Sequence, residues 1–220
     1  MSTPRLEINL DQIRHNATVL VDRLARRGIS VTGVTKATLG SARVAREFIG
    51  AGVTAIGDSR IENIERMRAA GVHAEIVLVR SPMLSQCDRV VAHADISMNT
   101  ELDVLSGLSD AATRAGRAHQ VILMVELGDL REGIMPGDLL AIAERARQFP
   151  LLTIVGIGAN QACQSGSTPD EHAMAELSAL VLTVESNLGI ALPIVSGGNS
   201  ANLTWALGAG AIGRVNNLRL

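Results

Sequence analysis

Short apolar runs alternate with amphipathic segments along almost the whole chain. The first clear run, Val31-Thr32-Gly33-Val34-Thr35, is rich in β-branched residues, as is typical of a buried strand, and it leads into Lys36. Seven similar runs follow it. The predicted strands are 31–36, 54–58, 74–79, 94–98, 120–127, 152–158, 192–196 and a last one within 213–218.

Amphipathic segments fill the intervals between these strands, and they predict helices at 41–49, 60–70, 100–115, 137–148 and 169–188. Asp11 is expected to cap a first helix, and Pro169 to begin the long helix that ends at Leu188. Strands that alternate with helices over roughly 200 residues are typical of a (β/α)8 barrel of the TIM type. A doubly wound open sheet is the alternative, but no G-x-G-x-x-G follows the first strand. The alternation at Leu6–Leu10 predicts an extra N-terminal strand outside the barrel.

Composition narrows the class of protein. The net charge is −2, and the chain is poor in aromatic residues, with one Trp, two Phe and no Tyr. We therefore expect no nucleic-acid partner. The sequence holds no apolar run of 18 residues and starts without an apolar signal region, so no membrane segment or signal peptide is expected. With Cys87 and Cys163 as the only cysteines, we expect a reducing compartment and a cytoplasmic protein.

Candidate chemistry lies at the ends of the predicted strands, where barrels of this kind carry their active sites. Lys36 ends the first strand, and a desolvated lysine suits Schiff-base chemistry. Alternatively, it simply extends to solvent. The turn Ser196-Gly197-Gly198-Asn199-Ser200 follows the seventh strand, and its backbone N–H groups suit a phosphate. An ordinary glycine turn that caps a helix is the alternative.

Other predicted strand ends are also polar. They carry Asp58-Ser59-Arg60, Glu126 with Arg131, and Asn160 with Gln161 and Cys163. Each is an ordinary loop feature taken singly, but their coincidence with Lys36 on one face favours a site. The five histidines are expected at the opposite end or in helices, and their spacing predicts no metal site.

Six segments together resemble a known family. They are Val34-Thr35-Lys36-Ala37, Gly57-Asp58-Ser59-Arg60-Ile61-Glu62-Asn63, Leu130-Arg131-Glu132-Gly133-Ile134-Met135-Pro136, Gly156-Ile157-Gly158-Ala159-Asn160-Gln161-Ala162-Cys163, Ser196-Gly197-Gly198-Asn199-Ser200 and Asn216-Asn217-Leu218-Arg219-Leu220. In this order they make the chain similar to the N-terminal barrel of the alanine racemase family, the fold-type III enzymes that use pyridoxal 5′-phosphate (PLP). The resemblance is nearest to the branch of ornithine and broad amino-acid racemases.

The resemblance implies PLP as cofactor and gives each matching residue a role. Lys36 would carry PLP as a Schiff base, and Arg131 would lie near the phenolic oxygen of the cofactor. Asn160 stands where alanine racemases carry a histidine against the ring. Arg219 would face the pyridine nitrogen, and because arginine does not give up its proton, the cofactor would be a weaker electron sink. The phosphate would be bound by Ser200 with the rest of its turn, Ser196, Gly197, Gly198 and Asn199.

The resemblance implies that the protein interconverts the L- and D-isomers of ornithine or of another amino acid. It also implies that the full-length protein is a homodimer. Family members continue into a β-rich second domain, so we expect 1–220 to be one barrel domain of a truncated chain. In alanine racemases a tyrosine of the partner subunit supplies the second acid/base group, whereas this sequence has no tyrosine. Cys163 is a candidate substitute, and without one we expect Cα hydrogen exchange with slow racemisation.

Two other functions stay open. One is a single-barrel PLP carrier without turnover, of the kind that maintains PLP homeostasis. The other is a PLP-independent barrel that forms Schiff bases with sugar phosphates.

Overall fold

The computed structural model describes residues 5–162 and 169–220. In this part of the chain, parallel strands pair in chain order and β8 pairs back onto β1, which closes a barrel. The strands are β1 (Ser30–Val34), β2 (Ala55–Asp58), β3 (Ile76–Leu78), β4 (Ile96–Asn99), β5 (His119–Val125), β6 (Leu152–Ala159), β7 (Ile194–Ser196) and β8 (Asn217–Arg219). The predicted (β/α)8 barrel is confirmed.

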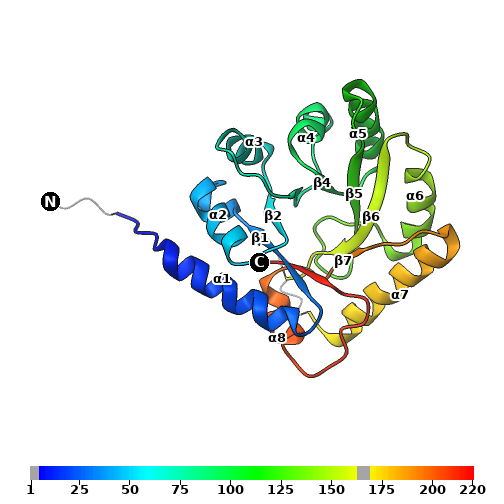
Figure 1. Ribbon diagram of the computed structural model, residues 1–220. Helices are drawn as coiled ribbons and strands as arrows, with labels where there is room; N and C mark the ends of the chain where they lie inside the picture. Colours follow the sequence, from blue (N-terminus) through cyan, green and yellow to red (C-terminus); the bar gives the residue numbers. More distant parts are fainter. Residues whose placement is uncertain (1–4, 163–168) are drawn as a thin grey trace.

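Helices surround the barrel, as Figure 1 shows. They are α1 (Leu10–Ala25), α2 (Ala42–Gly50), α3 (Ile61–Ala69), α4 (Cys87–His93), α5 (Leu102–Ala115), α6 (Leu139–Ala146), α7 (Glu171–Leu188) and α8 (Leu203–Ala206). Short 3-10 turns precede several of them: η1 (Lys36–Thr38), η2 (Leu84–Gln86), η3 (Pro136–Asp138) and η4 (Ser200–Asn202).

Alternate residues of each strand face two different cores. On β5, Val121, Leu123 and Val125 pack outward into the large cluster between barrel and helices. Ile122 and Met124 point inward, into a smaller cluster inside the barrel. Because β5 is buried on both faces from Val121 to Val125, this part of its sequence is an apolar run rather than a polar–apolar alternation. The arrangement leaves the carboxyl ends of the strands, and the loops after them, to form the site.

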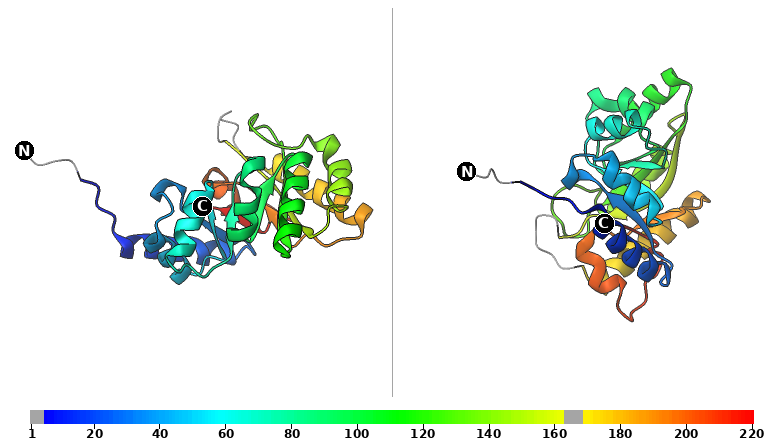
Figure 2. Two further views of the ribbon diagram at one scale, coloured as in Figure 1. Left: turned by 90° about the horizontal axis from the view of Figure 1, so that it is seen from above. Right: turned by 60° about the vertical axis from the view of Figure 1, so that its left-hand side comes forward.

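The N-terminal strand predicted at Leu6–Leu10 is wrong. Residues 5–9 have no regular structure and extend away from the barrel (Figures 1 and 2), and Leu10 begins α1. The helix is capped by Asn9, whose side chain accepts a hydrogen bond from the Gln12 N–H, rather than by Asp11. A strand needs a neighbour for its backbone groups, and within the described residues none pairs with this segment.

Two other predictions differ in detail. Helix α4 was not predicted, because it is only seven residues long and gives little periodicity. Helix α7 begins at Glu171 and is capped by Asp170, so Pro169 precedes the cap instead of occupying the first turn. Among the described residues no helix is long and apolar enough to cross a membrane. No cluster of His, Cys, Asp and Glu suited to a metal ion occurs in the same residues.

Candidate active site

Lys36 lies just past the carboxyl end of β1. The strand ends at Val34, and Lys36 is the first residue of the 3-10 turn η1 rather than the last residue of the strand. It is exposed, and it is the only lysine among the 220 residues, beside 19 arginines. The chain therefore presents a single side-chain amine, and that amine is at the candidate site.

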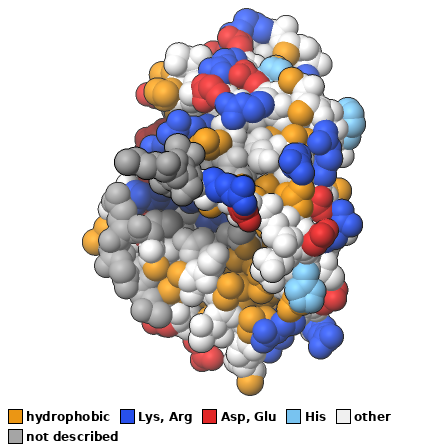
Figure 3. Space-filling model, turned by 90° about the vertical axis from the view of Figure 1, so that its left-hand side faces the viewer, with side chains coloured by type: hydrophobic (Ala, Val, Ile, Leu, Met, Phe, Trp, Pro, Cys, Tyr) orange, Lys and Arg blue, Asp and Glu red, His pale blue; other side chains and the backbone are white. Residues whose placement is uncertain are grey.

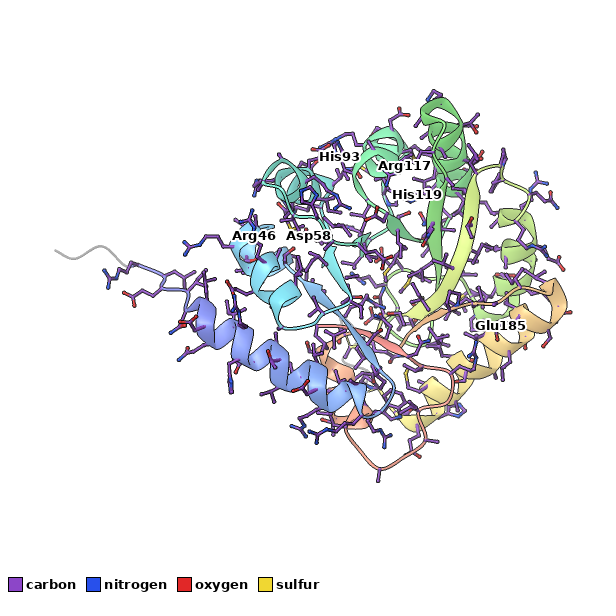
Figure 4. The ribbon with its side chains drawn as sticks, in the orientation of Figure 1. Arg46, Asp58, His93, Arg117, His119 and Glu185 are labelled. Carbon is purple, nitrogen blue, oxygen red and sulfur yellow. The ribbon has the colours of Figure 1, made fainter. Side chains whose placement is uncertain are left out.

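A buried hydrogen-bond network anchors the turn that carries Lys36. Thr35 is fully buried and donates through its hydroxyl to Asp58 Oδ2 at 2.8 Å. Asp58, at the end of β2 (Figure 4), is also fully buried. Its other oxygen, Oδ1, accepts from Asn63 Nδ2 at 2.9 Å and from the Arg60 N–H at 3.0 Å. The turn is thus tied to β2 and to the start of α3, which fixes the backbone next to Lys36.

A cavity of about 770 Å³ opens beside Lys36. Figure 3 shows Lys and Arg side chains gathered around a hollow on one face of the molecule. Six of the predicted site residues line the cavity: Lys36, Arg131, Asn160, Asn199, Ser200 and Arg219. The other three, Ser196, Gly197 and Gly198, are buried and are not part of its lining.

Arg219 is the most firmly held cation of this cavity. It is buried at the end of β8, and its guanidinium donates to Ser196 Oγ at 2.6 Å, Ala159 O at 2.9 Å and Asn160 Oδ1 at 2.7 Å. Ser196 Oγ in turn donates to Asn217 Oδ1 at 2.8 Å. These three acceptors are neutral, and together they fix the direction of the guanidinium.

The turn after β7 offers backbone donors. Gly198 has a φ of +107°, a conformation that disfavours other residues, and an added Cβ would lie 3.3 Å from Asn202 Nδ2. The Gly197 N–H donates to Asn217 O, so it is not available to a ligand. In contrast, the N–H groups of Gly198 and Ser200 have no hydrogen-bond partner among the described residues.

One side chain next to this turn is left unsatisfied. Gln161 is buried, its backbone oxygen accepts from Asn199 Nδ2 at 2.8 Å, and its Nε2 has no partner among the described residues. Gln161 packs against Gly198, since a Cβ at Gly198 would lie 3.5 Å from its Cγ. The turn therefore collects N–H donors that an anion would satisfy.

Arg131 is paired with two carboxylates. Its Nε lies 3.4 Å from Asp129 Oδ2, which is buried, and one of its terminal nitrogens lies 3.2 Å from Glu132 Oε1. The loop that carries these residues is held by Glu126, whose Oε1 accepts from the N–H groups of Gly128 and Leu130. Arg131 thus enters the cavity with its charge largely compensated.

His119 lies at the amino end of the barrel, as predicted. It begins β5, away from Asp58 in Figure 4, and its Nε2 is 2.8 Å from Ser97 Oγ. Burial, aided by the nearby Arg117 charge, lowers the pKa of His119 to about 4. Cys163, the predicted substitute for the tyrosine, lies outside the described residues.

Sequence reasoning missed two features of this site. The role of Thr35 as an anchor was not predicted, because it depends on Asp58 and Asn63 from neighbouring elements. Arg80, which lines the cavity two residues after β3, was also missed. For Lys36, which was predicted, the sequence holds a further signal: it is the single lysine beside 19 arginines.

Comparison with known proteins identifies the family. The model of the alanine racemase N-terminal domain matches residues 8–219. A lysine racemase of Thermotoga maritima is 38% identical over 100% of this chain and 61% of its own length. An ornithine racemase of Acetoanaerobium sticklandii is 33% identical over 91% of this chain and 56% of its own. The chain thus spans about three fifths of the length of these relatives.

Solved structures agree on the fold. Alanine racemase from Streptomyces lavendulae superposes with a TM-score of 0.83 at 20% identity, covering 99% of this chain and 58% of the other. D-threonine aldolase from Filomicrobium marinum superposes with a TM-score of 0.84 at 16% identity, covering 99% of this chain and 61% of the other. At these identities the likeness supports the barrel alone, whereas the family model matches nearly the whole sequence. The chain therefore belongs to the alanine racemase N-terminal domain family.

Proposed function

We propose that this chain is the PLP-binding barrel of an amino-acid racemase. The observation that carries the proposal is the position of its only lysine in a cavity that also holds a buried, firmly bonded arginine and a turn with unpartnered N–H groups. The cavity volume of about 770 Å³ lies within the range of about 300–1,000 Å³ that is usual for small-molecule sites. Relatives named lysine, ornithine and alanine racemase support the same reaction class.

The donor set of the cavity fits each part of PLP. The Lys36 amine suits the aldehyde, and the Ser200 hydroxyl with the Gly198 and Ser200 N–H groups suits the phosphate. Arg219 suits the ring nitrogen, and Arg131 suits the phenolic oxygen. Asn160, which accepts from Arg219, would lie against the ring. Ser196, Gly197 and Asn199 would support the phosphate turn from behind.

The residues of the chain would then divide the work as follows. PLP, when bound, supplies an electron sink for the charge that develops as the Cα proton leaves. Lys36 takes that proton from one face of Cα and returns it. Arg219 donates a hydrogen bond without releasing its proton, which limits how much charge the ring accepts. This restraint favours return of the proton to Cα over side reactions, as racemisation requires.

We further propose that the substrate is a diamino acid such as lysine or ornithine. The lysine and ornithine racemases match 100% and 91% of this chain. Alanine is the alternative substrate, because an alanine racemase of Thermobifida fusca is 32% identical over 89% of this chain. A homodimer stays a prediction, which sedimentation of the PLP-loaded chain tests.

The experiment measures hydrogen exchange at Cα and the change of configuration at Cα in the same reaction. The chain is loaded with PLP and incubated with L-lysine, L-ornithine or L-alanine in deuterated water, and deuterium at Cα and the D-isomer are measured. We expect Cα exchange and slower formation of the D-isomer with a diamino acid, and neither with Lys36→Ala. His93→Gln, a change at a partly exposed residue of α4, serves as the control and should behave as wild type.

The outcome separates the open functions. PLP binding without any Cα exchange would contradict the racemase proposal and favour a carrier. A failure to bind PLP at all would exclude both and favour a barrel that forms Schiff bases with other substrates. Formation of the D-isomer as fast as exchange would indicate a second acid/base group within these 220 residues.

A further inference from the structure

A separate cavity lies inside the barrel at its amino end, away from Lys36. Its volume is about 180 Å³, which is room for roughly six water-sized molecules. Most of its lining residues begin a strand or directly precede one: Ser30, Thr54, Glu75, Ile96, Ile194 and Asn217. Glu75 is the only ionisable residue of this lining, and it also lines an outer cavity of about 650 Å³. Glu75 therefore lies where the inner cavity meets the outer one.

The polar wall of the inner cavity offers acceptors and few donors. The hydroxyls of Ser30 and Thr54 each donate to a backbone oxygen, at 2.9 and 3.0 Å. The amide nitrogen of Asn217 donates to Ser30 Oγ at 3.2 Å and to Thr32 Oγ1 at 3.1 Å. The remaining lone pairs of these hydroxyl oxygens suit a ligand that donates hydrogen bonds.

The charge of Glu75 has no partner in the described chain. Its side chain makes no ion pair and no hydrogen bond within residues 5–162 and 169–220. The two arginines of the outer cavity are paired with Asp95, which lies 2.6 Å from Arg68 and 3.1 Å from Arg117. Although Glu75 is exposed, partial burial of its carboxylate and the nearby Asp95 charge raise its pKa. A cation beside Glu75 would supply the missing countercharge.

The rest of the inner cavity is apolar. Val77, Ile96, Met98 and Ile122 belong to the hydrophobic cluster inside the barrel, and Ile194 packs against it. A ligand that fills the cavity must therefore be apolar on one side and donate hydrogen bonds on the other. Each methylene group that leaves water for this wall would strengthen its binding.

We propose that this cavity binds a small primary alkylammonium ion of about three to five carbons. The ammonium group carries three donors and no acceptor, which matches Glu75 and the hydroxyl oxygens of Ser30 and Thr32. The alkyl chain then lies against the apolar wall. An anionic ligand would be repelled by Glu75. The site is at the opposite end of the barrel from Lys36, so it does not depend on the proposed function.

The test titrates n-butylammonium into the 220-residue chain without PLP, so that the amine meets no aldehyde. Isotope-labelled methionine methyl groups report where it binds. Met98 lines the cavity, whereas Met83 and Met135 are exposed and do not. We expect the Met98 signal to shift in a saturable way while the other two stay unchanged. Neutral n-butanol should bind about tenfold more weakly, because it lacks the charge, and n-butyrate should bind more weakly still.

Glu75→Gln separates the charge from the shape of the cavity. It should weaken n-butylammonium binding about tenfold and leave n-butanol binding unchanged. Glu144→Gln, at an exposed carboxylate of α6 that lines neither cavity, is the matched control and should bind as wild type does. A Met98 signal that does not respond to n-butylammonium overturns the proposal. Equal affinity for the ammonium ion and the alcohol, unaffected by Glu75→Gln, also overturns it.

Discussion

The chemistry proposed for this barrel depends on single residues whose surroundings are unusually polar for a protein core. Thr35 and Asp58 are fully buried, yet their side chains are bonded to each other and to Asn63. A buried carboxylate is costly unless donors surround it, and here neutral donors do so. The network holds the backbone that precedes Lys36, so it acts on the site through position and not through contact with a ligand.

Replacement of Thr35 by valine tests this anchor. Thr35→Val keeps the shape of the side chain but removes the donor at 2.8 Å from Asp58 Oδ2. We expect the free energy of unfolding in urea to fall by about 1–3 kcal/mol, because a buried acceptor loses a partner. PLP affinity should fall as well. Thr38→Val, which removes a bond to a backbone oxygen in the same turn, should cost less; an equal cost for both would contradict the special role of Thr35.

At the scale of elements, the turn between β7 and η4 has a backbone geometry that suits an anion. Its glycine at φ +107° and its unpartnered N–H groups at Gly198 and Ser200 are backbone properties, and Ser200 adds a hydroxyl exposed toward the cavity. A helix N-terminus follows in η4 and α8. The two short helical pieces are too short to bind an anion by themselves, so the side chain should matter.

Removal of the Ser200 hydroxyl measures that contribution. Ser200→Ala should weaken PLP binding by about 1.5–3 kcal/mol, the usual contribution of a hydrogen bond to a charged group. The dissociation constant is measured by absorbance titration. Ser186→Ala, at an exposed serine of α7 that donates to Leu182 O, should bind PLP as wild type does. An unchanged constant in Ser200→Ala would place the phosphate elsewhere in the cavity.

The same scale shows which features the sequence could predict. Strands such as β5 were predictable, because burial on both faces leaves an apolar run, Val121–Val125, in the sequence. Lys36 and the 196–200 turn were predictable because strand ends meet on one face of a barrel. The ion pairs of Arg131 were not, since they depend on how the 128–135 loop folds. The prediction of a strand at Leu6–Leu10 was wrong. The segment alternates apolar and polar residues as a strand does, but no strand among the described residues pairs with it.

At the scale of the whole molecule, the two ends of the barrel have different electrostatic tasks. The carboxyl ends of the strands expose cations to a cavity, whereas the amino ends contain a buried neutral histidine, His119. Burial and the Arg117 charge oppose its protonation, and Asp95 only partly offsets them, so its pKa is about 4. Protonation would place a charge that Asp95 only partly compensates beside Ser97 Oγ in the β4–β5 region. The stability of the barrel should therefore depend on pH through this residue.

The sign of that dependence follows from proton binding. Above about pH 6.5, His119 is neutral in the folded and the unfolded chain and contributes no pH dependence. Between about 6.5 and about 4 the unfolded chain binds a proton that the folded chain does not, so stability falls as pH falls, by about 1.4 kcal/mol per pH unit. Urea unfolding from pH 7.5 to 4.5 measures the loss. His119→Gln should remove this part of the slope, whereas His93→Gln should keep it; parallel curves for wild type and His119→Gln would show that the pKa of His119 is the same in the folded and the unfolded chain.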